Sequence, residues 1–307
     1  MTGLLRSAAL AVALLALAPL PANALPAGDH AVTLRDRAYI LHVPSKLGPR
    51  PPLVLNFHGG GGNASAHQKY SRMDAVADRE GFLVVYPEGT GPLEGTLQTW
   101  NAGGCCGSAV RDNVDDVGFV RRLLDDLAKR QAFDPARVYA TGLSNGAMMS
   151  YRIGAELSDR IAAIAPVAGA IAVELYPTAI AVPVMHIHSA DDPRAPIGGG
   201  LGPPFPMLNT RVNHMAVDAA LSEWAKFNGC ATPAVQQERK EWKGHTATLL
   251  AYPKCRAEVL FWKLTGAGHV WPGGELDYLP KLLGPGTAVI DANEEMWRFF
   301  SRHKLAR

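Results

Sequence analysis

The segment from Val138 to Met149 constrains the fold of this chain more than any other. It reads V-Y-A-T-G-L-S-N-G-A-M-M, so a β-favouring run meets a G-x-S-x-G turn and helix-forming residues follow. Glycines at both ends of that turn leave room where strand and helix nearly touch. We therefore expect the hydroxyl of Ser144 to stand exposed at a sharp turn, with the positive end of a helix behind it. With 31 glycines in the chain, the pentapeptide alone would arise by chance in roughly one such chain in five, so the rest of the chain must supply its partners.

Segments with strand and helix patterns alternate along most of the chain. Apolar or alternating runs predict strands within 31–43, as a hairpin, and at 53–57, 82–86, 138–140, 161–167, 182–187 and 259–264. Helical spacing predicts helices at 70–80, 117–127, 221–227 and 293–300, besides the helix after Ser144. This alternation predicts an α/β fold with a mostly parallel central sheet and helices on both faces. The stretch 88–113 shows no periodicity, and irregular loops of that length are usually functional.

The first 24 residues have the pattern of a cleaved signal peptide. Arg6 gives a short positive region, residues 8–17 are apolar, and 22–24 form an A-x-A cleavage site. The apolar run is too short to cross a bilayer and is soon interrupted by prolines. We therefore expect a secreted protein, extracellular or periplasmic, in which residues 25–307 form a single catalytic domain.

Composition and charge narrow the classes of partner. The net charge is +2 and 19% of the residues are charged, without a basic stripe of the kind that binds nucleic acid. No second hydrophobic segment follows the leader. The Gly- and Pro-rich stretch 197–206 predicts an ordered surface loop and not a domain boundary. We therefore expect neither a nucleic-acid partner nor a membrane partner.

The four cysteines predict disulfides. Cys105, Cys106, Cys230 and Cys255 allow three pairings. A bond between the adjacent Cys105 and Cys106 would leave Cys230 to pair with Cys255, and closing that loop is worth about 3 kcal/mol. Zinc binding is the rival interpretation, but no C-x-x-C or H-x-x-x-H spacing supports it. We therefore expect structural disulfides and no metal.

Chemically informative residues follow three of the predicted strands. Ligands of parallel sheets bind beyond the carboxyl ends of the strands. Asp191 and Asp192 come soon after the strand at 182–187, and His269 comes soon after the strand at 259–264. The chain order is therefore serine, acid, histidine, which is the order expected for a G-x-S-x-G serine and its partners.

These residues suit nucleophilic catalysis by serine. A serine hydroxyl is a poor nucleophile near neutral pH, so His269 would take its proton and later return it to the leaving group. Asp192 would hold the imidazole in one tautomer, with Asp191 as the alternative. The tetrahedral oxyanion would be bound by the backbone N–H groups of Asn145 and of Gly60, which lies in the glycine-rich turn after the strand at 53–57.

The other histidines have structural interpretations. His58 precedes the turn that holds Gly60 and is expected to order it, at the edge of the substrate pocket. His186 and His188 alternate on a buried strand, which favours core histidines over metal ligands. Packing alone gives little reason for an imidazole at His269, which favours catalysis there.

Loop aromatics and one acidic pair remain open to two interpretations. Trp100 and Trp271, with Tyr278, either form an aromatic platform in the substrate pocket or anchor their loops. Asp115 and Asp116 precede the predicted helix 117–127, where capping is favoured over catalysis.

Five motifs in one order resemble a known family. They read H-G-G-G-G, then W-N-A-G-G-C-C-G with V-D-D-V-G-F-V, G-L-S-N-G-A-M-M, H-I-H-S-A-D-D-P and G-A-G-H-V-W-P-G-G. Together they resemble the secreted esterases of the polyhydroxybutyrate depolymerase and feruloyl esterase group, in particular its LpqC-like subgroup. The resemblance implies an α/β-hydrolase fold, no cofactor, and catalysis by Ser144, Asp192 and His269. The chain departs from the family's acid motif, in which Gly-Thr precedes the aspartate and Val-Pro-Tyr follows it.

The expected function is carboxylic-ester hydrolysis through an acyl-enzyme. The resemblance implies hydroxyalkanoate or hydroxycinnamoyl (feruloyl) esters as substrates, with acetyl esters as an alternative. The chain also lacks the substrate-adsorption domain that many polymer depolymerases of the family carry, so we expect small or solubilised esters to be attacked more readily than solid polyester. A serine peptidase on the same fold and a non-catalytic binding protein are the competing interpretations.

Overall fold

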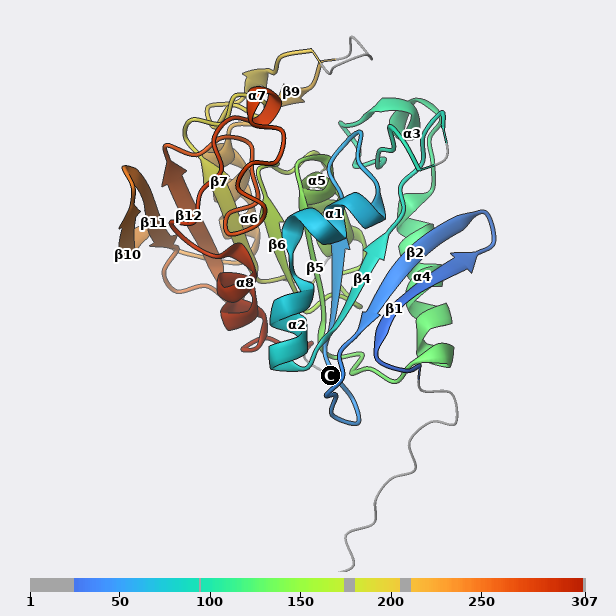
Figure 1. Ribbon diagram of the computed structural model, residues 1–307. Helices are drawn as coiled ribbons and strands as arrows, with labels where there is room; N and C mark the ends of the chain where they lie inside the picture. Colours follow the sequence, from blue (N-terminus) through green and yellow to red (C-terminus); the bar gives the residue numbers. More distant parts are fainter. Residues whose placement is uncertain (1–24, 94, 174–179, 205–210, 306–307) are drawn as a thin grey trace, which may run out of the picture.

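The computed structural model describes residues 25–305 apart from 94, 174–179 and 205–210 (Figure 1). The predicted signal peptide at 1–24 lies outside the described residues. The strands are β1 (Gly28–Leu34), β2 (Arg37–Val43), β3 (Leu53–Phe57), β4 (Leu83–Pro87), β5 (Val138–Leu143), β6 (Ala163–Val167), β7 (Val184–Ser189), β8 (Gly200–Leu201), β9 (Asn213–His214), β10 (Val235–Trp242), β11 (His245–Ala251) and β12 (Val259–Thr265). The helices are α1 (Ala64–Ser71), α2 (Asp74–Glu80), α3 (Gly107–Arg111), α4 (Asp116–Arg130), α5 (Asn145–Glu156), α6 (Val217–Phe227), α7 (Pro280–Leu283) and α8 (Ala292–Phe300).

The sheet confirms the predicted architecture. Its strand order is β1-β2-β4-β3-β5-β6-β7-β12-β11-β10, and the six strands from β4 to β12 in this order run parallel to one another. Antiparallel pairs form both edges, and the predicted opening hairpin is the edge pair β1–β2. None of the described helices is long and apolar enough to cross a membrane.

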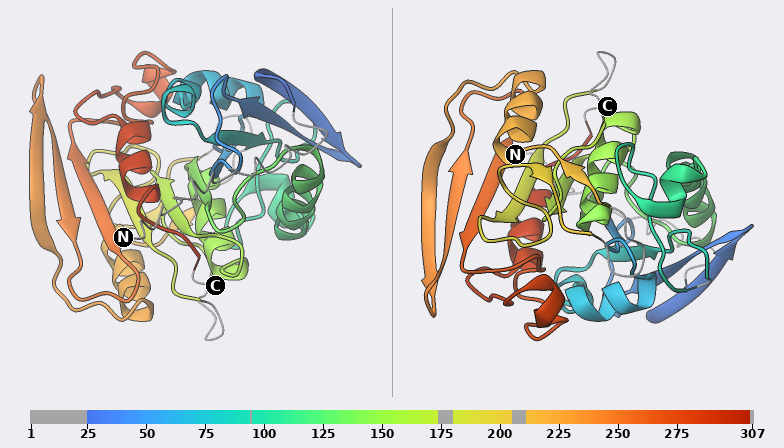
Figure 2. Two further views of the ribbon diagram at one scale, coloured as in Figure 1. Left: turned by 90° about the horizontal axis from the view of Figure 1, so that it is seen from below. Right: turned by 90° about the horizontal axis from the view of Figure 1, so that it is seen from above.

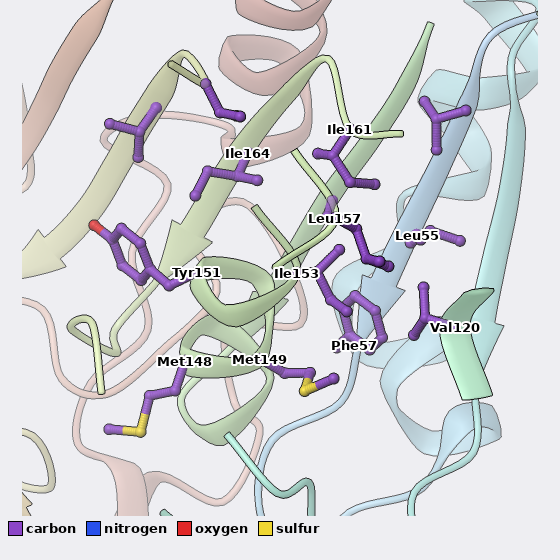
Figure 3. Packing of buried hydrophobic residues seen from close by; sticks show 14 of the residues in the cluster. Leu55, Phe57, Val120, Met148, Met149, Tyr151, Ile153, Leu157, Ile161 and Ile164 are labelled. Carbon is purple, nitrogen blue, oxygen red and sulfur yellow. The ribbon is translucent and has the colours of Figure 1, made fainter. Parts of the chain in front are cut away.

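Each face of the sheet carries its own hydrophobic core. Helices α4, α5 and α6 pack on one face, and α1, α2 and α8 pack on the other (Figures 1 and 2). Alternate residues of one strand enter different cores, as Val54 and Leu55 of β3 do. Burial on both faces explains why these strands are continuous apolar runs. Figure 3 shows one side of α5 with Ile153 beside Phe57 and Val120, whereas Tyr151 points the other way.

The sequence prediction differs from the longer elements of the structure in two places. The helix predicted at 70–80 is split into α1 and α2, because Arg72 adopts a left-handed conformation with φ of 56°. The antiparallel hairpin β10–β11 was missed. Strand β10 reads V-Q-Q-E-R-K-E-W and is mostly exposed at the sheet edge, so it lacks the apolar pattern that marks a buried strand.

Candidate active site

Ser144 occupies a strained turn between β5 and α5. Its φ and ψ are 58° and −117°, a backbone conformation that is rare for any residue with a side chain. The turn is held by the N–H of Ser144, which donates to the carbonyl of Val167 on β6 over 2.8 Å. A Cβ added to Gly142 or Gly146 would collide with the carbonyl oxygen of Phe57. Both glycines of the motif therefore have the packing role that the sequence indicates.

Gly146→Ala is expected to destabilise the protein by about 3 kcal/mol, because the added methyl group must push α5 away from β3. Gly198→Ala is the control, since a Cβ there meets no atom within 4 Å and the residue lacks a positive φ. That change should alter stability by less than about 1 kcal/mol. Urea unfolding monitored by circular dichroism measures both. Equal midpoints for the two variants would contradict the close approach of α5 to β3.

Asp192 and His269 meet at the carboxyl ends of β7 and β12. These strands are parallel neighbours, so the loops that follow them lie at the same edge of the sheet. Nδ1 of His269 is 2.7 Å from Oδ2 of Asp192. The other oxygen of Asp192 accepts bonds from the N–H groups of Arg194 and Ala195, both at 2.8 Å. Burial raises the pKa of the Asp192 carboxyl, but His269, His188 and the bond from Ala195 outweigh burial, so the net shift is downward and the group is ionised near neutral pH.

The neighbouring aspartate has a different position. Asp191 is exposed, and its carboxylate accepts a hydrogen bond of 2.6 Å from the N–H of Gly266. That bond joins the loop after β7 to the loop after β12. The structure therefore brings Asp192, and not Asp191, to the imidazole of His269.

His186 and His188 lie in a buried hydrogen-bonded chain behind this pair. The hydroxyl of Tyr151 is 3.0 Å from His186, and the two imidazoles approach within 3.2 Å. His188 then bonds the carbonyl of Ala195 at 2.8 Å and lies 3.5 Å from the Asp192 carboxylate. Burial lowers the pKa of both histidines, so they are neutral. This is the environment expected for core histidines.

The glycine-rich turn after β3 is ordered by His58. One ring nitrogen of His58 bonds the carbonyl of Gly59 at 2.8 Å, and the other accepts from the N–H of Gly89 at 3.0 Å. Burial lowers the pKa of His58 to about 4, so the ring is neutral. Among the described residues, no hydrogen bond uses the backbone N–H of Gly60 or of Asn145. Both residues line the same cavity as Ser144.

A cavity of about 300 Å³ contains these groups. Ser144, His269, His58, Gly60 and Asn145 all line it. The rest of its wall is largely apolar: Ala66, Tyr70, Leu97, Leu143, Met148, Pro203, Val212, Tyr278, Leu279, Leu282 and Leu283. The polar or charged side chains His67, Arg194 and His214 also reach it.

Trp100 and Trp271 are not an aromatic platform. Neither lines the cavity, and their side chains are 0% and 1% exposed. The indole of Trp100 donates to the carbonyl of His58 at 3.0 Å, and that of Trp271 donates to Asn293 at 3.0 Å. Both tryptophans anchor their loops, the other interpretation that the sequence allowed. Tyr278 does line the cavity, stacked on Tyr70 at a centroid distance of 4.1 Å.

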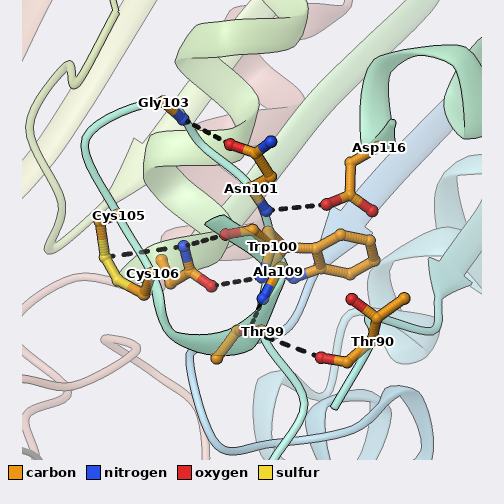
Figure 4. Close-up of a disulfide and its surroundings, with 10 residues drawn as sticks. Thr90, Thr99, Trp100, Asn101, Gly103, Cys105, Cys106, Ala109 and Asp116 are labelled. Atoms are coloured by element: carbon orange, nitrogen blue, oxygen red, sulfur yellow. Dashed lines mark hydrogen bonds between the residues drawn. A yellow bond between two sulfur atoms is a disulfide. The ribbon is translucent and has the colours of Figure 1, made fainter. Parts of the chain in front are cut away.

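Three residues of the segment 88–113 line the cavity, namely Leu97, Cys105 and Cys106. Figure 4 shows the surroundings of the two cysteines and of Trp100. The side-chain amide of Asn145 holds this segment in place. Its oxygen accepts from the N–H of Trp100 at 2.7 Å, and its nitrogen donates to the carbonyl of Trp100 at 3.1 Å. Cys105 and Cys106 form the predicted adjacent disulfide in this segment and line the cavity. The second predicted disulfide, between Cys230 and Cys255, is also present.

The acidic pair at the start of α4 has two structural roles. Asp115 caps the helix by accepting from the N–H of Gly118 at 2.8 Å, as predicted. Asp116 does not cap. Its buried carboxylate pairs with Arg37 at 2.8 Å and accepts from the N–H of Asn101 at 2.7 Å, which ties the long segment to β2. Neither aspartate lines the cavity.

One described cluster has donor atoms close enough to hold a metal ion. It consists of Asp29, His42 and Asp74, at the β1–β2 edge and the start of α2. None of the three lines the cavity. Exposed acidic groups of this kind commonly occur without an ion, so the cluster adds nothing to the chemistry of the site.

Sequence reasoning missed several residues of the cavity wall. They are His67, Tyr70, Leu279, Leu282, Leu283, Arg194 and His214. No motif marks them, because they come from short helices and loops whose sequences have no feature in common. Only Arg194 carried a local signal, two positions after Asp192.

Comparisons with known proteins give consistent results. Residues 37–224 match the family described as esterase PHB depolymerase. The NocK protein of Nocardia uniformis subsp. tsuyamanensis is 32% identical over 86% of this chain and 81% of its own length. Feruloyl esterase B of Piromyces equi is 29% identical over 74% of this chain, which spans only 41% of that protein. The solved structure of acetyl xylan esterase from Aspergillus awamori has the same fold, with a TM-score of 0.60 at 16% identity over 89% of this chain and 99% of the other.

Proposed function

The chain belongs to the esterase PHB depolymerase family and is an esterase, and we propose that it hydrolyses carboxylic esters through an acyl-enzyme on Ser144. The observation that carries this proposal is the 2.7 Å contact between the ionised Asp192 and His269. His269 in turn lines the same cavity as Ser144, which is held at a strained turn. A core histidine would have no need of a serine in the same cavity. The arrangement suits a nucleophile, a base and an orienting acid.

Each group has one role in the proposed reaction. His269 accepts the proton of Ser144 as the hydroxyl oxygen attacks the ester carbonyl carbon, and it returns that proton to the leaving alcohol. Asp192 accepts from Nδ1 of His269, so the other ring nitrogen is the one that faces the serine. The N–H groups of Gly60 and Asn145 bind the oxyanion, with the positive end of α5 behind Asn145. Water then repeats the sequence on the acyl-enzyme and releases the acid.

The proposed substrates are esters with an apolar body, of the hydroxyalkanoate or hydroxycinnamoyl type. The largely apolar wall of the cavity and its volume of about 300 Å³ support this class. Short acetyl esters, as in the acetyl xylan esterase that shares the fold, are the second candidate. They would fill less of the cavity.

Export and a single catalytic domain at 25–307 are also part of the proposal. The leader pattern at 1–24 supports export, and so do two disulfides, which persist in oxidising compartments. The continuous ten-stranded sheet supports one domain.

Active-site labelling and a substrate panel test the proposal together. A fluorophosphonate probe should add to one serine, and mass spectrometry of the digested protein should locate it at Ser144. The panel holds 4-nitrophenyl acetate and butyrate, methyl ferulate, hydroxybutyrate oligomers and a peptide amide. We expect turnover of the larger esters and none of the amide. Labelling of another serine would refute the mechanism, amide turnover would favour a peptidase, and inactivity on the whole panel would favour a binding protein.

A further inference from the structure

One wall of the cavity carries a histidine that the proposed mechanism does not use. His67 lies in α1, lines the cavity, and is 4% exposed. The cavity is otherwise largely apolar, with side chains such as Leu97, Met148 and Leu279. A polar ring in such a wall needs a hydrogen-bond partner for each of its nitrogens.

The partner of one ring nitrogen is Asn56 of β3. Nε2 of His67 lies 2.8 Å from Oδ1 of Asn56. The orientation of this amide follows from its other end, where Nδ2 donates to the hydroxyl of Ser71 at 3.3 Å, while that hydroxyl donates to the carbonyl of Gln68. Asn56 therefore presents its oxygen to His67, and Nε2 must carry the proton.

The second nitrogen, Nδ1, is consequently an acceptor. Burial lowers the pKa of His67 to about 3, so the ring stays neutral and keeps this lone pair. No hydrogen bond to Nδ1 occurs within the described residues, and Nδ1 is not among their fully buried unpaired atoms. The small exposed surface of His67 therefore includes this nitrogen, at the cavity wall.

Aromatic neighbours fix the orientation of the ring. Trp271 meets His67 edge-on at a centroid distance of 5.4 Å, and Tyr86 lies at 6.5 Å. With Nε2 bonded to Asn56 as well, the ring has little freedom to turn. The acceptor is thus held in place before a ligand arrives, which lowers the cost of binding.

We propose that Nδ1 of His67 accepts a hydrogen bond from a hydroxyl group of the substrate, so that the enzyme prefers esters that carry a hydroxyl in addition to the ester group. This inference rests on the proposed function. A substrate without such a hydroxyl displaces water from Nδ1 and leaves that nitrogen without a hydrogen bond. A hydroxylated substrate replaces the hydrogen bond that water made to Nδ1. A carboxylate has no donor and gains nothing from His67.

Matched substrate pairs test the preference. The pairs are methyl ferulate with methyl 3,4-dimethoxycinnamate, and 4-nitrophenyl 3-hydroxybutyrate with 4-nitrophenyl butyrate. In each pair the ratio of kcat/KM, with hydroxyl over without, is compared between the wild-type protein and His67→Phe. We expect the ratio to fall about tenfold for at least one pair, because one neutral hydrogen bond is lost. Turnover of the substrate without the hydroxyl should change by less than about threefold.

His30→Phe is the control, because His30 lies on β1 at the edge of the sheet and does not line the cavity. Its ratios should stay at the wild-type values.

If His67→Phe fails to fold, Asn56→Val replaces it. Losing the Asn56 oxygen lets His67 adopt either tautomer, so the ratio should fall in part. Unchanged ratios in a folded variant that still hydrolyses 4-nitrophenyl butyrate would overturn the role of His67 and leave the proposed ester hydrolysis standing. An equal fall in His30→Phe would overturn it too. Failure of the proposed function is distinct, because turnover would then survive in Ser144→Ala.

Discussion

Ser144→Ala is expected to lower kcat/KM for ester hydrolysis by a factor of about 10⁵. Without the hydroxyl no acyl-enzyme forms, and the oxyanion donors can only assist a direct attack by water. Ser144 already carries a Cβ at its positive φ of 58°, and its side chain lies at the cavity wall. Alanine therefore fits the same backbone. The variant should therefore fold normally, and the loss should appear in kcat. Steady-state kinetics with 4-nitrophenyl butyrate measures it.

Ser150→Ala provides a control from the same helix. Ser150 is buried, donates to the carbonyl of Gly146 at 2.9 Å, and does not line the cavity. Loss of the Ser150 hydroxyl should leave kcat/KM within about threefold of the wild-type value and lower the free energy of unfolding by about 1 kcal/mol. Ester turnover that persists in a purified Ser144→Ala protein would refute the assignment of the nucleophile.

Asp192→Asn is expected to lower kcat by a factor of about 10⁴. An amide at this position can present its NH₂ group to Nδ1 of His269, which then keeps the wrong tautomer and cannot take the serine proton. Oδ1 of Asp192 also accepts two backbone N–H bonds, and the asparagine oxygen can retain these. The loop geometry should therefore survive, so the loss should come from the tautomer. Single-turnover kinetics of acylation measures this step.

Asp191→Asn is the matched control, one residue away. Asp191 is exposed, and its carboxylate accepts from the N–H of Gly266, a bond that an asparagine oxygen can also make. We expect kcat within about fivefold of the wild-type value, with the loop after β12 kept in place. A larger loss in Asp191→Asn than in Asp192→Asn would reverse the assignment of the acid.

Much of this protein could be predicted from local sequence patterns. The turn at Ser144 requires two glycines at fixed spacing, and a strand such as β3 must be apolar throughout because both of its faces are buried. The order of strands and helices then predicts a parallel sheet whose carboxyl ends meet at one edge. Ser144, the Asp191–Asp192 pair and His269 could be named for this reason. Each follows a strand in the sequence.

Features that depend on packing between distant segments were decided by the tertiary structure alone. Local sequence favoured Asp192 but left Asp191 as the alternative, and the register of β7 beside β12 brings Asp192 to His269. Trp100 and Trp271 occupy loops near the site, but burial of a large indole stabilises the protein more than exposure at a cavity mouth, and both rings anchor the loops. His67 carries no motif. Its place in the cavity wall comes from the break at Arg72, the bond to Asn56 and the ring of Trp271, and these contacts exist only in the folded chain.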